Sequence, residues 1–438
     1  MRRSSAVVAL IVLLNTGIAS PLAARPGADQ PDPKLQLYFW ERVRQESWDN
    51  TMSLDDRAND SSAYLRLRTG LGAYWRPGKG WELHLRLSNE NRLYLAPKLD
   101  PRLKKDFDVH ELFVDQLSVR WRSAGPRPLT VTLGRQDMMF GEGFLIMDGG
   151  PLDGSRSAYF NGLRLDWAPR QNANLTFFLV RQGRSDRLLP VVNDQHQAMA
   201  EQEEQGVGLY YRGKAKRTAL EAYLFRKDAF AFAALPRGSV NVAGGRVVHP
   251  FSDALSLSAE AALQLGKLGQ ETRRGLGGYV HLDGSPGRRF PVPALVTLGG
   301  IWLSGDDPGT PRCEAWDPAF GRWPKWSDSL IYLQARETRI ADWTNFASLF
   351  AVLLFAPSDR IKLSLGGHFL SAPERTAPAA LLSGAGRDRG GLFIAKASYE
   401  ASKNLTGRLI WEWFNPGSFY RAGADPYHWV QFEMFFRF

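Results

Sequence analysis

The chain has 438 residues, of which 44% are hydrophobic and 23% are charged, so it is neither a disordered chain nor a collagen-like fibre. Its 55 basic residues outnumber 45 acidic ones, for a formal net charge of +10, and lysine supplies only 13 of them, which leaves 42 arginines. The single cysteine, Cys313, excludes an internal disulfide framework and any multi-cysteine metal site.

The first 24 residues are typical of a secretory signal peptide. Arg2 and Arg3 precede an apolar run that ends at Leu14, and small residues lead to Ala24. We expect cleavage near Ala24, an exported chain, and one mature domain over residues 25–438.

The longest nearly unbroken apolar run after this segment is 346–356. A membrane-spanning helix needs about 20 apolar residues, so the mature sequence predicts no such helix. The remaining classes are a secreted soluble protein and a transmembrane β-barrel.

Alternation of polar and apolar residues begins in the segment 64–76. Leu65, Leu67 and Leu71 lie on one face of the expected strand, and Arg66 and Arg68 lie on the other. The same pattern recurs along the chain in segments of 10 to 13 residues, which is longer than most strands of soluble proteins and matches outer-membrane strands.

Aromatic residues and connection lengths favour the barrel further. Trp75, Trp81, Trp121 and Trp167 stand at the ends of alternating segments, where aromatic girdles meet the membrane surfaces. Short connections alternate with long ones, as expected for short periplasmic turns and long extracellular loops.

The sequence therefore predicts an all-β fold, a transmembrane antiparallel β-barrel of 18 strands. Residues 242–249 give the weakest pattern, and a strand at 330–340 is an alternative. The expected strands are 34–45, 62–76, 80–95, 109–122, 128–137, 157–169, 172–182, 204–213, 216–227, 242–249, 254–266, 271–283, 293–303, 345–355, 359–370, 389–401, 403–414 and 427–438.

The C-terminal segment gives a separate indication. Val430, Phe432, Met434 and Phe436 share one face with Phe438, the last residue. Outer-membrane barrels commonly end with such an aromatic strand, which the barrel-assembly machinery reads.

An 18-stranded barrel is too wide for side chains to fill, so its polar wall faces an aqueous channel or a plugged lumen. Rings of arginine or lysine are the usual way for a pore to select anions. The alternative is that these charges only pair across neighbouring strands. The candidate pore-lining residues on the polar wall are Arg66, Arg68, Arg86, Arg120, Arg164, Lys362 and Arg408.

Other chemistry has little support in the sequence. The seven histidines are scattered without ligand spacing, and no catalytic or phosphate-binding motif is present. Asp306 and Asp307 lie in a Gly-rich loop that resembles a small calcium site, but a plain polar loop explains it better. We therefore expect no cofactor. We also expect no nucleic-acid partner, because the positive charge is spread over the strands.

Several short motifs resemble the alginate-export family of outer-membrane channels. They are the arginine-rich second strand, Asp115-Gln116-Leu117, Gly134-Arg135-Gln136 with Gly141, Ser304-Gly305-Asp306-Asp307, and Glu412 with Phe414-Asn415-Pro416-Gly417. The likeness is distributed over most of residues 35–438.

This resemblance implies an 18-stranded barrel with an electropositive pore that passes an anionic polyuronate. It adds Arg135 to the candidate pore residues, beside Arg66 and Arg68. Arg135 has the parity of Val131 and Leu133, which should face lipid, so it needs a β-bulge to turn inward or must snorkel at the interface.

The leading interpretation is a monomeric, non-enzymatic, anion-favouring channel in the outer membrane of a Gram-negative cell. Its expected role is secretion of an acidic exopolysaccharide such as alginate, with outer-membrane lipid as the other partner. A first alternative is a porin for uptake of small anionic solutes or oligosaccharides, which is favoured if a long loop such as 138–156 folds inward. A second alternative is an outer-membrane enzyme with a Ser/His/carboxylate cluster.

Overall fold

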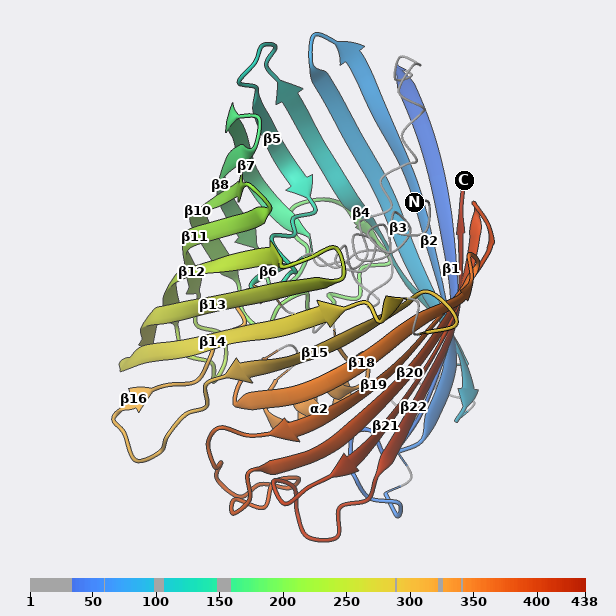
Figure 1. The fold of residues 1–438 in the computed structure, drawn as a ribbon, viewed down its shortest axis with the longest axis vertical. Helices are drawn as coiled ribbons and strands as arrows, with labels where there is room; N and C mark the ends of the chain where they lie inside the picture. The colour runs from blue at the N-terminus through green and yellow to red at the C-terminus, as the bar shows by residue number, and fades with distance from the viewer. Residues whose placement is uncertain are drawn as a thin grey trace.

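Eighteen antiparallel strands close into a barrel, as the sequence predicts (Figure 1). The computed structural model describes residues 34–58, 60–97, 106–147, 159–287, 290–321, 326–339 and 342–438. The expected signal peptide lies outside these residues. Strand β1 (Leu35–Asp49) pairs with β2 (Ser62–Gly78) on one side and with β22 (Tyr427–Arg437) on the other, and this last pairing closes the barrel.

The other wall strands follow in chain order, each antiparallel to its neighbours. They are β3 (Trp81–Ala96), β4 (Phe107–Arg122), β5 (Leu129–Gln136), β7 (Phe160–Arg170), β8 (Ala173–Gln182), β10 (Glu204–Ala215), β11 (Thr218–Ala229), β12 (Gly238–Pro250), β13 (Leu255–Leu268), β14 (Glu271–Gly284), β15 (Ala294–Leu303), β18 (Phe346–Ser358), β19 (Ile361–Ser371), β20 (Asp388–Ser402) and β21 (Leu405–Pro416). Each corresponds to one expected strand, including β12, which had the weakest sequence pattern.

The two faces of the wall differ as the period-two alternation requires. Buried and exposed residues alternate over the first eight residues of β10 and the first seven of β22, and the exposed set on β22 includes Val430 and Phe432. Apolar side chains on the outer face are freely exposed, such as Leu224 at 60% and Leu298 at 54%. A closed barrel with an apolar outer surface is the architecture of bacterial outer-membrane proteins. The chain is therefore an outer-membrane protein.

The remaining elements are short. Strands β9 (Val191–Val192) and β16 (Arg312–Cys313) pair with β4 and β14 of the wall, whereas β6 (Ile146–Met147), β17 (Phe320–Gly321) and the helix α2 (Leu330–Glu337) do not join the wall sheet. The alternative expectation of a strand at 330–340 is therefore wrong: this apolar run forms a helix that does not join the wall. Among the described residues, no helix is both long and apolar enough to cross a bilayer.

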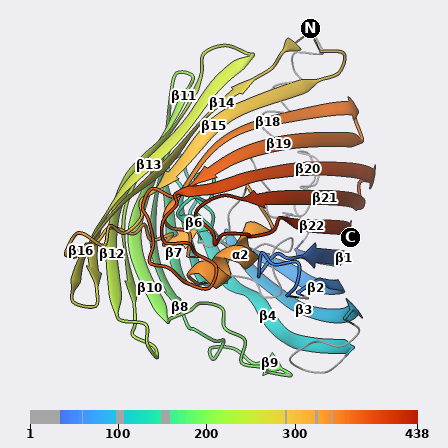
Figure 2. The same cartoon turned by 90° about the horizontal axis from the view of Figure 1, so that it is seen from below.

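The barrel is not empty, because long loops fold into it from one end. Figure 2 shows β6 and α2 inside the ring of strands. The main buried apolar cluster joins these inner elements to the wall, for example Phe140 and Phe320 from loops with Phe178 and Phe225 from strands. The inward fold expected as an alternative for the loop after β5 is confirmed for its described residues.

Candidate functional site

Six inward-facing arginines on β1, β2 and β3 form what we call the arginine cluster: Arg42, Arg44, Arg66, Arg68, Arg86 and Arg92. The cross-strand register brings like charges together, because Arg66 pairs with Arg44 on one side and with Arg92 on the other. Like charges directly opposite one another destabilise a sheet, so this cluster requires carboxylates between its members.

Glu46 and Glu90 supply two of these carboxylates. Arg66 lies 2.5 Å from Glu46 and 3.0 Å from Glu90, and Arg42 lies 2.8 Å from Glu90. All four side chains are at least nine-tenths buried, and charges in such surroundings need close partners and further hydrogen bonds. These ion pairs hold three neighbouring strands together on the lumen side.

Arg68 lies in the middle of this cluster and is fully buried. Its guanidinium is 5.8 Å from the ring centroid of Trp40, a cation–π distance. The ring of Trp40 lies across Gly70, where a Cβ atom would come within 2.1 Å of it. The inward-facing glycine of β2 is thus what lets a large ring from β1 lie flat on the wall beside Arg68.

A β-bulge in β4 brings a carboxylate partner, Asp115, to Arg86. The register of β3 with β4 shifts between the pairs Arg86–Gln116 and Leu87–Val114, which leaves Asp115 as an extra residue. This shift lets both Asp115 and Gln116 face inward. Arg86 then binds Asp115 at 2.7 Å and Asp137, the first residue after β5, at 3.3 Å.

Two further candidates, Arg408 and Lys362, lie on the opposite side of the β1–β22 closure. Arg408 is 3.3 Å from Glu433, which also binds Arg44 at 2.6 Å. Lys362 is 3.1 Å from Glu400. Both cationic side chains remain about one-quarter exposed.

Arg120 and Arg164 lie closer to the short-turn end of the barrel. Arg120 binds Glu82 at 3.0 Å, and half of its side chain is exposed. Arg164 binds Asp166 at 2.7 Å on its own strand and lies 5.4 Å from the ring of Phe140. The structure therefore gives both of these candidates a carboxylate partner.

Arg135 has a different environment from the other candidates. It is 2% exposed and makes two parallel 2.8 Å contacts with Asp186, and its guanidinium lies 3.9 Å from the ring centroid of Tyr159. The pairing of β5 with both neighbours runs on without an extra residue, so the expected bulge is absent there. Gly134, the residue before it, has a φ of +119°, in the range that favours glycine.

The loop that holds Asp186 completes the wall at this point. Strand β5 pairs with β4 only up to Leu117, and β9 of the loop pairs with β4 further along, at Leu112 and Phe113. The contact between Arg135 and Asp186 therefore fixes the loop after β8 against a part of β4 that β5 does not reach. Sequence reasoning missed this role because the partner is 51 residues away.

The first inner loop, residues 137–147, crosses from β5 into the lumen. Phe140 packs on Tyr210 of β10 with 4.5 Å between ring centroids, and Phe144 stacks on Trp316 at 5.3 Å. Between them, Glu142 binds Arg246 of β12 at 2.8 Å. This loop is attached to the far wall by both apolar and charged contacts.

The environment of Glu142 fixes its charge. Burial alone would raise the pKa of this carboxyl, but hydrogen bonds from His281 and Arg246 outweigh burial and lower the pKa to about 2. Glu142 is therefore ionised at neutral pH and holds the tip of the first inner loop against β12 and β14.

The second inner loop, residues 304–345, meets the first. Its strand β17 pairs in parallel with β6, through Phe320 with Ile146 and Gly321 with Met147. The two loops thus form a small sheet inside the barrel, and this sheet narrows the lumen.

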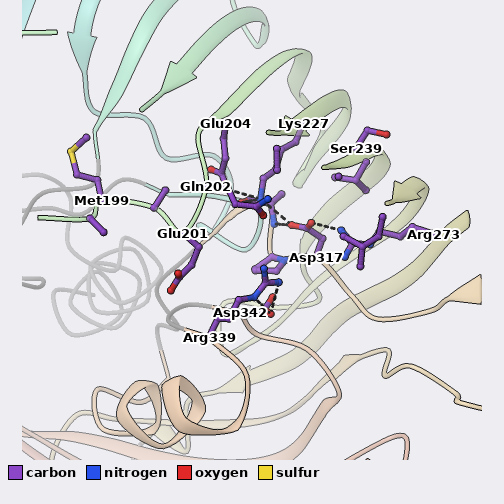
Figure 3. Close-up of a pocket in the computed structure, with 18 residues that line it drawn as sticks. Met199, Glu201, Gln202, Glu204, Lys227, Ser239, Arg273, Asp317, Arg339 and Asp342 are labelled. Atoms are coloured by element: carbon purple, nitrogen blue, oxygen red, sulfur yellow. Dashed lines mark hydrogen bonds and ion pairs between the residues drawn. The ribbon is translucent and has the colours of Figure 1, made fainter. Parts of the chain in front are cut away.

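Asp317 anchors the second inner loop to one side of the wall (Figure 3). Its carboxylate forms ion pairs with the guanidinium of Arg273 on β14 at 2.5 Å and with the ammonium of Lys227 on β11 at 3.2 Å. Burial raises the pKa of Asp317, but the two cations outweigh it and hold the pKa below its usual range. A small cavity of about 130 Å³ adjoins this anchor, with Glu201 and Arg339 among its lining residues.

Glu412 anchors the same loop to the other side of the wall. This fully buried carboxylate of β21 accepts hydrogen bonds from the hydroxyls of Ser327 at 2.6 Å and Ser329 at 2.5 Å, and from the backbone N–H of Asp328 at 2.9 Å. The loop therefore spans the lumen between two fixed points rather than lying free at the mouth.

Helix α2 is held by two more polar contacts. The hydroxyl of Tyr332 donates to Glu46 at 2.8 Å, and Arg389 of β20 binds Glu337 at 2.7 Å. Burial raises the pKa of Tyr332 well above its usual value, so this phenol stays a donor. Glu46 therefore links the arginine cluster to the inner loop.

The sequence indicated some of these residues without identifying them. Arg42, Arg44 and Glu46 follow the period-two pattern of the first strand but are not among the candidates predicted from the sequence. Glu412 was noted as part of a motif, without its partners. Which carboxylate neutralises which arginine depends on strand register and loop placement, and neither is readable from spacing alone.

The described residues show no candidate metal site. They contain no group of three or more His, Cys, Asp or Glu side chains arranged to hold a metal ion. Asp306 and Asp307 instead accept backbone N–H groups of Glu314 and Gly309. The Ser348–His368 contact is 3.4 Å long, and that imidazole stacks on a phenylalanine ring.

Several solved structures of outer-membrane porins are similar to this chain. The chain is similar to OccAB1 of Acinetobacter baumannii, with a TM-score of 0.61, 10% identity, and coverage of 92% of this chain and 96% of that one. It is also similar to OccK5 (OpdH) and to OpdK with vanillate, both from Pseudomonas aeruginosa, with TM-scores of 0.58 and 0.56, 10% identity, and coverage of 92% and 98%. These identities establish the shared fold alone.

No protein-family profile matches the chain, and no curated protein matches it either. The resemblance to the alginate-export family therefore remains a prediction from short motifs. The structural comparison supports the broader class, an outer-membrane β-barrel with the fold of a porin.

Proposed function

We propose that the chain is a passive channel for small anionic solutes across the outer membrane. The observation that carries this proposal is the arginine-rich wall on one side of the lumen. Among the described residues, the ion pairs there join eight arginines to six carboxylates: Arg42, Arg44, Arg66, Arg76, Arg86, Arg92, Arg120 and Arg408 with Glu46, Glu82, Glu90, Asp115, Asp137 and Glu433. The many guanidinium groups of this wall favour anions near it.

Because two arginines share one carboxylate, each ion pair is weak enough for a passing anion to replace the carboxylate. Glu82 serves both Arg76 at 2.8 Å and Arg120 at 3.0 Å, and Arg120 is half exposed. A passing carboxylate can bind such a guanidinium while the protein carboxylate keeps its other partner. Conduction needs sites that a solute can enter and also leave.

The inner loops favour small solutes over the polymer that the sequence first indicated. The first inner loop packs on β10 and β12, and the second is anchored through Asp317 and Glu412. A polyuronate would need both loops displaced from these contacts. One of the similar structures, OpdK, was solved with vanillate, a small carboxylate.

Liposome swelling tests this function directly. Purified protein is reconstituted, and swelling rates are compared for gluconate, for neutral sugars of similar size, and for uronate oligomers of increasing length. We expect gluconate to enter faster than the neutral sugars and the rate to fall steeply beyond two or three sugar units. Equal rates for charged and neutral solutes, or free passage of long oligomers, would contradict the proposal.

A further inference from the structure

The lipid-facing surface of β18–β21 carries a groove that the channel function does not use. It encloses about 730 Å³ and opens toward the bilayer, because its walls are outward-facing residues such as Leu349, 70% exposed, and Phe369, 62% exposed. We call it the outer groove. Its lining is mostly apolar and includes His368 and, at one end, Asn415.

The strand register shows how the groove is built. Ala351 of β18 pairs with Gly367 of β19, and Gly391 of β20 pairs with Asn415 of β21. Gly367 also pairs with Phe393, and Gly391 pairs with Phe369, so the two glycines lie diagonally between two phenylalanines. The floor therefore runs across four strands through Ala351, Gly367, Gly391 and Asn415.

Packing within the protein does not explain the two glycines. A Cβ atom added at Gly367 would meet no atom within 4 Å, and one at Gly391 would meet only the carbonyl oxygen of His368 at 4.0 Å. Neither residue has a positive φ in the range +20° to +160°. Glycine in the middle of a strand weakens it and often marks a place where a ligand approaches the backbone closely.

The width of the groove selects its occupant. Residues two apart on one strand are separated by about 7 Å, so a floor bounded by such neighbours is about one side chain wide. An α-helix with its side chains is roughly 10–12 Å across and does not fit. A single hydrocarbon chain does, and hydrocarbon chains surround this face of the wall.

Asn415 supplies a polar end. Its side-chain amide has no hydrogen-bond partner among the described residues, and it lies one residue from the end of β21. This is the long-loop end of the barrel, which faces the outside in bacterial barrels. An ester carbonyl at the top of an acyl chain of the outer leaflet would lie close to this amide.

We propose that the outer groove holds one acyl chain of an outer-leaflet lipid. The chain lies over Gly367 and Gly391 between Phe369 and Phe393, and the carbonyl at its head accepts a hydrogen bond from Asn415. This makes the groove a specific lipid site, distinct from the annular lipid that contacts the rest of the wall.

Native mass spectrometry of the full chain, titrated with dilauroyl phosphatidylcholine in detergent, tests the site. We expect wild-type protein to keep one lipid at detergent concentrations that remove the others. The double variant Gly367→Leu with Gly391→Leu should lose this lipid, with binding at least tenfold weaker. Ala261→Leu, on the lipid face of β13, is the matched control and should keep it. Equal retention by wild type and double variant would overturn the proposal.

A second measurement needs no variant and covers the case in which the double variant fails to assemble. Wild-type protein is titrated with diphytanoyl phosphatidylcholine, which has the same headgroup but methyl-branched chains. Because the groove is one side chain wide, we expect the tightly held lipid to bind about tenfold more weakly in the branched form. Equal binding of straight and branched chains would show that the groove does not select a chain.

Discussion

The hydroxyl of Ser329 donates a 2.5 Å hydrogen bond to the carboxylate of Glu412, so a residue beside the inner helix is joined to a wall strand 83 residues further along the chain. Ser327 and the backbone of the same turn donate to the same carboxylate. The narrowing of the lumen thus depends on a few buried polar contacts rather than on the strands themselves.

Replacing Glu412 with alanine should release the second inner loop on that side. Four hydrogen bonds to one buried carboxylate are lost and their donors stay buried, at a cost of ~2–4 kcal/mol to the docked state of the loop. We expect larger and noisier single-channel currents. Glu400→Ala, which removes a half-exposed carboxylate on β20, should leave the current unchanged. Unchanged single-channel currents in the Glu412→Ala variant would show that other contacts hold the loop.

Acid should loosen the first inner loop. The pKa of Glu142 is about 2 in the folded chain and 4.5 without its partners, so its stabilising effect is complete above about pH 4.5 and is lost as the pH falls toward 2. Current fluctuations should therefore increase as the bath is taken from pH 6 to pH 3. Glu142→Gln should show the same fluctuations already at pH 6. Identical recordings across this range would contradict the role of this ion pair.

Removing partly exposed positive charge should weaken anion preference. Arg120→Gln with Arg408→Gln removes two guanidinium groups that share their carboxylates with other arginines. We expect the chloride-to-potassium permeability ratio to fall about twofold to fivefold, in line with ~0.4–1 kcal/mol for partly exposed charges. Arg181→Gln, which removes a 71% exposed arginine from the outer face of β8, should have no effect.

Arg135 should prove to be a structural residue. Arg135→Lys keeps the charge but loses the two-pronged contact with Asp186 and the stacking on Tyr159, which we expect to cost about 1–3 kcal/mol. Limited proteolysis should cut the loop after β8 faster in this variant, while ion selectivity stays as in wild type. A change in selectivity without faster cleavage would instead place Arg135 in the conduction path.

Deleting Phe438 should reduce assembly. Its backbone N–H donates to the carbonyl of Phe39 at 2.8 Å, and its carbonyl accepts from the N–H of Phe39 at 3.2 Å, so it extends the pairing that closes the barrel. We expect less heat-modifiable protein in the outer membrane. A normal amount would show that neither this pairing nor the terminal aromatic residue limits assembly.

The wall could be predicted from the sequence because its pattern is local. Period-two alternation between lipid and lumen marks most strands, and β12 follows it over its first six residues, 238–243. The inner elements carry no such mark. The run that begins at Leu330 is short and apolar, a pattern that fits either a strand or a helix, and only its contacts inside the lumen decide for the helix.

The candidate site was predicted only in part. Parity placed Arg66 and Arg86 on the inward face, but their partners Glu90 and Asp115 depend on register and on a β-bulge. For Arg135, parity required a β-bulge or a snorkelling side chain, but no residue is inserted there and the guanidinium is buried against Asp186 of a distant loop. Long-range pairing of this kind has no signature in residue spacing.

The reversal potential of single channels in a planar bilayer under a tenfold potassium chloride gradient tests the central claim most directly. The arginine-rich wall of the lumen predicts a potential of the sign set by chloride, the more permeant ion. A potential of the opposite sign, set by potassium, would show that the shared carboxylates govern the lumen and would contradict the proposed anion channel.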